Sequence, residues 1–189
     1  MKVSVWGPKS ESALPLLGAL LLMLAYVPRG QGQALPTATD TRPTLSVGGE
    51  YSDFQADYGK RTLGGYTITA DYDRTPRYSL EFQARVLRMN QEVGTHETTF
   101  LIGPKVTYRR RWFNPYAKLL IGDGKFHFPY NYAEGSYFVL APGAGVDVRL
   151  GHSRYTIRAI DFEYQSWPNF SFGGLNPYGI STGISVRVY

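Results

Sequence analysis

The chain has 189 residues, a formal net charge of +5 and no cysteine. The absence of cysteine excludes a disulfide-stabilised fold, and the mild positive charge is not typical of a nucleic-acid-binding protein. The length allows one ordinary domain once an N-terminal export signal is set aside, because single domains commonly hold ~100 to 200 residues.

Residues 1–34 differ in kind from the rest of the chain. Lys2 and Lys9 precede an apolar run over residues 16–27, and small residues follow at 32–34. This pattern predicts a cleaved secretory signal peptide, because the apolar run is shorter than the ~20 residues that a spanning helix needs. Cleavage after Ala34 removes three bases and one acid and lowers the formal net charge from +5 to +3. Residues 35–43, rich in Thr and Pro, are expected to form a short N-terminal leader.

Eight stretches of about ten residues, between Thr44 and Val188, alternate apolar and polar side chains with period two. The third stretch shows the alternation most cleanly. Its apolar face holds Tyr78, Leu80, Phe82, Ala84 and Val86, and its polar face holds Ser79, Glu81, Gln83 and Arg85. No stretch after the signal peptide shows a sustained helical period, so the chain is predicted to be all-β.

The connections between these stretches alternate in length. Long links cover residues 52–61, 89–97, 126–136 and 167–176, and short ones cover 73–77, 110–113 and 151–154. Outer-membrane barrels have this asymmetry, with short periplasmic turns and longer external loops. Residues 44–189 are therefore predicted to form an eight-stranded antiparallel up-and-down transmembrane β-barrel, in the outer membrane of a Gram-negative-type bacterium.

The apolar face is expected to meet lipid, because its residues are bulky while the polar face is rich in Gly, Ser, Thr and Ala. A water-facing surface would carry about a quarter to a third charged residues. A soluble barrel with an apolar ligand-binding interior is the least favoured alternative. Tyrosines at the strand ends predict aromatic girdles, although Tyr is also a good strand residue. The tyrosines concerned are Tyr51, Tyr66, Tyr72, Tyr78, Tyr108, Tyr164 and Tyr178.

The polar face also carries ionisable residues that the pattern places in the lumen. Unpaired charges in a narrow lumen are costly, so these residues are expected to form a salt-bridged network that closes it. The predicted network comprises Glu50, Asp71, Glu81, Arg85, Lys105, Lys118, Asp147, Arg149, Asp161, Glu163 and Arg187. The alternative for the same residues is a narrow pore for small solutes. Pro104 and Pro142 lie inside two of the strands and are expected to mark a bulge or a rim.

The segments 100–108, 114–122, 142–149 and 179–189 resemble the outer-membrane β-barrel family that includes the OmpA transmembrane domain and OmpX. The resemblance covers residues 44–189 and implies architecture rather than activity. It implies a monomer that contacts the lipid bilayer and lipopolysaccharide. It also implies recognition by the outer-membrane assembly machinery through the terminal aromatic residue Tyr189, which stands one residue out of phase with Ile184, Val186 and Val188.

No motif in the sequence points to a catalytic residue, a cofactor or a metal. His96, His127 and His152 are far apart in sequence, and no pair has metal-ligand spacing. An enzyme that acylates or deacylates lipid A is a lesser alternative, with Ser166 or Ser171 near His96 or His127 in space. The basic run 109–111 before Trp112 and Phe113 is interpreted as a contact with anionic head groups rather than with nucleic acid.

The long links carry a dense set of aromatic residues with one histidine. Either they are exposed and bind a partner, a glycan or a lipopolysaccharide sugar, or the last four of the eight stretches extend above the membrane and these side chains pack on each other. The sequence leaves both interpretations open. The residues are Phe126, His127, Phe128, Tyr130, Tyr132, Trp167, Phe170 and Phe172. The predicted role is structural or one of surface interaction.

Overall fold

The computed structural model describes residues 43–57, 62–89, 96–127, 135–151, 153–170 and 174–189. The expected signal peptide and nearly all of the expected leader lie outside these residues, as do His152, Ser171, Phe128, Tyr130, Tyr132 and Phe172. In the part of the chain that is described, no helix has the length and apolar character needed to cross a membrane.

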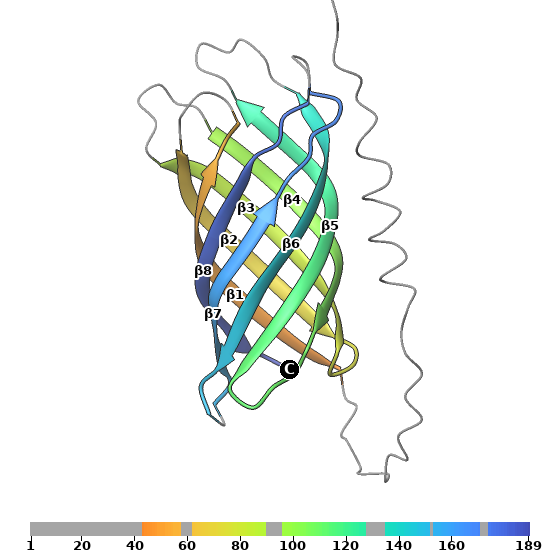
Figure 1. Cartoon of the computed structure of the whole chain (residues 1–189), viewed down its shortest axis with the longest axis vertical. Helices are drawn as coiled ribbons and strands as arrows, with labels where there is room; N and C mark the ends of the chain where they lie inside the picture. The colour runs from red at the N-terminus through yellow and green to blue at the C-terminus, as the bar shows by residue number, and fades with distance from the viewer. Residues whose placement is uncertain (1–42, 58–61, 90–95, 128–134, 152, 171–173) are drawn as a thin grey trace, which may run out of the picture. The chain divides into compact units, whose positions relative to one another are not determined.

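Eight antiparallel strands form a closed barrel in which each strand pairs with its sequence neighbours and the last strand pairs with the first (Figure 1). The strands are β1 (Thr44–Gln55), β2 (Thr62–Asp73), β3 (Tyr78–Met89), β4 (His96–Thr107), β5 (Phe113–His127), β6 (Ser136–Arg149), β7 (Tyr155–Tyr164) and β8 (Tyr178–Arg187). The predicted fold class is confirmed. We call the end of the barrel with the long links the loop end and the opposite end the turn end.

The chain end completes the barrel at the turn end. The Leu45 amide donates to the Tyr189 carbonyl over 2.9 Å, and the Val188 amide donates to the Leu45 carbonyl over 2.8 Å. These bonds extend the β1–β8 ladder beyond β8, so the main-chain polar groups at the start of β1 have partners. Closure of this kind is what lets a sheet cross a medium that offers no hydrogen bonds.

Bulky apolar side chains cover the outside of the barrel, as the alternation predicts. Phe82 is 46% exposed and Phe100 58%, whereas Glu81 and Arg85 are at most 1% exposed. This orientation is the reverse of that in a soluble barrel, whose outer wall is charged. An outward band of large apolar residues with a polar interior is the surface that a membrane-spanning barrel presents to lipid.

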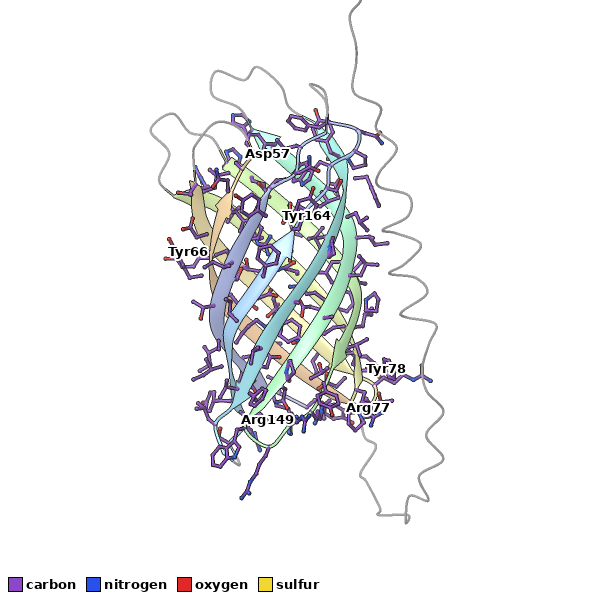
Figure 2. The ribbon with its side chains drawn as sticks, viewed as in Figure 1. Asp57, Tyr66, Arg77, Tyr78, Arg149 and Tyr164 are labelled. Carbon is purple, nitrogen blue, oxygen red and sulfur yellow. The ribbon has the colours of Figure 1, made fainter. Side chains whose placement is uncertain are left out.

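Tyrosines stand at both edges of this outward band, and all seven residues named as girdle candidates are exposed. Figure 2 shows Tyr66 and Tyr164 toward the loop end and Tyr78 beside Arg77 at the turn end. Tyr51 and Tyr66 are cross-strand partners whose rings meet edge to face, with centroids 6.0 Å apart. A phenol at such a level buries its ring and keeps its hydroxyl in contact with water.

The polarity of the strands reverses at the loop end, in the four strands before β5 as well as in the later ones. There the inward side chains are apolar and buried, namely Phe54, Leu63, Leu87, Phe126 and Val139. Outward neighbours include the exposed polar residues Asp53, Thr62, Arg88 and Lys125. Apolar inside and polar outside is the pattern of a barrel in water. The strands therefore continue past the apolar band, and the loop end has a small core of its own.

Neither proline marks a bulge. Pro104 lies near the turn-end rim, three residues before the end of β4, whereas Pro142 is in the middle of β6, where the expectation was wrong. Register shifts occur at Gly64/Gly65, at Val146/Asp147 and between Arg158 and Asp161. Pro104 keeps its register opposite Leu80, and Pro142 keeps its register opposite Leu119. In the β4–β5 ladder beside Pro104 and in the β6–β7 ladder beside Pro142, the pairing is interrupted, but the register is the same before and after the gap. The missing N–H of each proline therefore affects only one of the two ladders that its strand forms.

Candidate functional site

The lumen is the most densely organised part of the molecule, and Arg158 is central to its half nearest the turn end. The guanidinium nitrogens lie 2.7 Å from a Glu50 oxygen and 3.1, 3.3 and 3.2 Å from oxygens of Asp71, Glu81 and Asp147. Arg158 is 4% exposed. One planar cation with five donors thereby bridges carboxylates from β1, β2, β3 and β6 across the barrel.

Two lysines extend this network, Lys105 on the turn-end side and Lys118 toward the middle of the barrel. The Lys105 ammonium lies 3.1, 3.3 and 3.4 Å from oxygens of Asp71, Glu81 and Asp147. The Lys118 ammonium lies 2.9, 2.6 and 3.3 Å from oxygens of Glu81, Asp161 and Glu163. Glu81 therefore contacts three cations. Because each charge has several opposite neighbours, the interior is packed with buried salt bridges.

The network continues into the loop-end core through one line of polar contacts. Arg85 pairs with Glu163 over 2.7 Å, and Gln165 donates to the same carboxylate over 3.0 Å. The Trp167 indole N–H then donates to the Gln165 side-chain oxygen over 2.8 Å. Arg85 also lies over the Phe54 ring, with its guanidinium carbon 4.0 Å from the centroid. Ionic and apolar parts of the filling are thus joined rather than separated by a void.

Aromatic side chains form the cap of the barrel at the loop end. Phe126, Trp167 and Phe170 are buried, with ring centroids of Phe126 and Phe170 6.2 Å apart and those of Trp167 and Phe170 6.3 Å apart. Tyr137 packs on Phe170 with centroids 4.9 Å apart. Two interpretations of the aromatic residues in the long links were open, and Phe126, Trp167 and Phe170 agree with the one in which the side chains pack on each other. Each of the three is at most 8% exposed, which favours packing over binding of a partner for these residues.

The structure brings nine of the eleven predicted network residues together and separates two. Arg149, labelled at the turn end in Figure 2, lies outside the paired cluster. Together with Arg187, Asp73 and Arg109 it lines a polar cavity of about 50 Å³. The fourth cation of the network is Arg158, which the sequence analysis did not select. Six carboxylates therefore surround four cations.

A register shift explains why Arg158 was missed. Strict alternation from Ile160, Phe162 and Tyr164 places Arg158 on the outside, but Ala159 and Ile160 both point outward, and Arg158 turns inward. The signal was present in the sequence, because Tyr155 and Ile157 are apolar at odd positions and the apolar series resumes at even positions from Ile160. A change of phase within one strand indicates a bulge.

Glu97 is a second buried ionisable residue that the sequence analysis did not select. It is fully buried at the loop end, and neither carboxylate oxygen has a hydrogen-bond partner among the described residues. Its strand neighbours across the two ladders are Leu87 and Phe126. Buried carboxylates without partners are costly, so Glu97 is a weak point of the loop-end core.

The loop-end rim has a cavity of about 390 Å³ lined by His96, Lys125, Phe126, His127, Gly135 and Ser136. His96 and His127 face each other across the β4–β5 ladder. Ser166, considered for the enzyme alternative, does not line this cavity and instead pairs through its backbone with Leu140. Within the described ranges, no group of three or more His, Asp or Glu side chains is placed to hold a metal ion.

Comparison with known proteins identifies the fold but assigns no family. No protein-family model matches the chain, and no curated protein matches its sequence significantly. Solved structures that are similar to the chain, with TM-scores above 0.5, include the following three. Neisserial surface protein A has a TM-score of 0.55 at 12% identity, over 76% of this chain and 96% of that one. The N-terminal β-barrel domain of Pseudomonas aeruginosa OprF has a TM-score of 0.53 at 13% identity, over 77% and 99%. The outer membrane protein OprG of the same organism has a TM-score of 0.53 at 10% identity, over 78% and 96%.

These likenesses define a class, the small eight-stranded transmembrane barrels. At such identities the similarity is one of fold, and fold alone does not assign an activity.

Proposed function

We propose that the protein is a closed, non-conducting barrel of a bacterial outer membrane that acts as a structural or surface-interaction protein. The observation that supports this proposal most directly is the continuous filling of the lumen, from the carboxylates around Arg158 to the aromatic cap at Trp167. A channel needs binding sites that ions can enter and leave, whereas these charges are already engaged in salt bridges with one another. The narrow-pore alternative is therefore disfavoured.

The outer surface fits a bilayer at two levels. The apolar band between the tyrosine rows would face the hydrocarbon region, and the turn end would lie at the periplasmic interface. There Trp112 is exposed, and the Arg111 guanidinium lies 5.6 Å from the centre of its ring. Basic residues beside an interfacial Trp are suited to phospholipid head groups. At the loop end, exposed Arg88 and Lys125 are suited to lipopolysaccharide phosphates.

Export and assembly complete the proposal. Residues 1–34 would direct the chain through the inner membrane and be removed, with residues 35–43 as a short leader. Tyr189, exposed at the turn end, would serve as the terminal aromatic signal for the assembly machinery. The barrel would work as a monomer without a cofactor.

Planar-bilayer recording tests the closed lumen. We expect the folded protein to give no reproducible ohmic steps under conditions in which a general porin does. A variant with both Trp167→Ala and Arg85→Ala removes the connection between the ionic filling and the cap, so it should conduct intermittently. Steady unitary conductance steps from the unaltered protein would overturn the closed-barrel proposal, if they persist after repurification and after a change of salt.

A further inference from the structure

Two histidines that are 31 positions apart in sequence meet at the loop-end rim. His96 is the first residue of β4 and His127 the last of β5, and the two are direct partners in the β4–β5 register. Their imidazole rings are stacked, with centroids 4.7 Å apart and planes inclined by 23°. Antiparallel pairing therefore holds two nitrogen ligands side by side on rigid strand ends rather than on loops.

The ring separation suits a shared metal ion. A coordinating imidazole nitrogen lies ~2.1 Å from a zinc ion, so two rings that bind one ion at cis positions have centroids on the order of 5 Å apart. The observed separation of 4.7 Å already matches this value. Because the rings are stacked, binding of one ion requires each ring to rotate about its terminal side-chain torsion, which is a soft torsion, until one nitrogen of each faces the ion.

Space for the ion and its remaining ligands lies beside the pair. The rim cavity of about 390 Å³ is lined by both histidines and by Ser136, so water molecules can complete the coordination shell. Lys125 lines the same cavity and opposes a cation. Its side chain is exposed, however, and solvent and salt weaken this repulsion.

We propose that His96 and His127 chelate one late first-row transition-metal ion at the loop end, with Cu²⁺ bound more tightly than Ni²⁺ or Zn²⁺. Imidazole suits these ions, and the affinity order follows from the general trend of divalent first-row metals. With two protein ligands the site is open and the ion exchangeable. This site is separate from the Arg158 cluster of the lumen, because His96 and His127 are the end residues of β4 and β5 at the loop-end rim.

Titration of the detergent-folded protein with Cu²⁺, followed by electron paramagnetic resonance, tests the site. We expect one bound ion per barrel, with hyperfine splitting from two nitrogen ligands. His96→Ala and His127→Ala should each weaken binding at least tenfold. The matched control is His152→Ala, in the link between β6 and β7, which should leave binding unchanged. Lys125→Gln should strengthen binding several-fold.

A second measurement uses the unaltered protein and so does not depend on the folding of variants. Cu²⁺ or Zn²⁺ should protect His96 and His127, but not His152, from acylation by diethylpyrocarbonate, read by mass spectrometry. The proposal is overturned if one ion still binds with two nitrogen ligands in folded His96→Ala protein. Equal protection of all three histidines, or of none, would overturn it as well.

Discussion

At the scale of single residues, Arg158 has the largest number of opposite charges around it. Four carboxylates lie within 3.3 Å of its guanidinium nitrogens. Two of them, Asp71 and Asp147, also contact Lys105, and Glu81 contacts both lysines. Glu50 has no other salt bridge among the described residues. Loss of Arg158 would therefore leave one carboxylate unpaired and three others short of positive charge.

We predict that Arg158→Met lowers the free energy of unfolding by about 3 to 5 kcal/mol, the usual cost of removing one partner from a buried ionic cluster. Urea unfolding of the barrel in lipid vesicles measures this change. Arg154→Met is the matched control, because Arg154 is exposed just before β7 and its replacement should cost under about 0.5 kcal/mol. Equal effects of the two substitutions would show that the lumen pairs contribute no more than surface charges.

At the scale of elements, β7 carries one residue more than its neighbours accommodate. Arg158 pairs with Asp147 of β6 and with Gly183 of β8. The regular register resumes where Ile160 pairs with β6 and where Asp161 pairs with β8. Ala159 is the additional residue, and its presence turns Arg158 into the lumen. The position of one inward cation thus depends on a backbone irregularity.

We predict that a barrel lacking Ala159 still folds, because Arg158, Ile160 and Asp161 then alternate inward, outward and inward without a bulge. Deletion of Phe162 is the control, since it forces a carboxylate or Arg158 toward lipid, where a charge costs ~2 to 4 kcal/mol at mid-depth. The gel migration of unheated samples distinguishes folded from unfolded protein. Folding of the Phe162 deletion alone would contradict the assigned register.

At the scale of the whole molecule, the barrel has no free sheet edge, because β8 pairs with β1 over ten residue pairs. Closed sheets of this kind resist detergent until heated, since every strand must separate from both neighbours at once. Edge-free closure also accounts for a surface that is apolar outside yet does not present unpaired main-chain groups.

We predict that the protein fractionates with outer membranes and that its band on a denaturing gel shifts on heating. A chain truncated before Tyr178 lacks β8 and exposes the edges of β1 and β7, so it should show no shift. Recovery of the unaltered protein in the soluble fraction would refute the proposed location.

Period-two alternation, together with the alternation of long and short links, determined the strand number, the antiparallel order and which residues face outward. These properties are local, because side-chain direction along a strand follows from sequence position alone. Phe82 and Phe100 on the outside, with Glu81 and Arg85 on the inside, were predictable in this way.

Properties that depend on contacts between distant strands were settled by the tertiary structure. The carboxylates that surround Arg158 come from four other strands, and the burial of Phe126 and Trp167 requires strands that continue past the apolar band. His96 and His127 become neighbours because the β4–β5 register sets them opposite each other. The distance between two residues on different strands depends on the register of each ladder between them, on the bulges and on the closure of the barrel. The pattern of residues within one strand does not determine these distances.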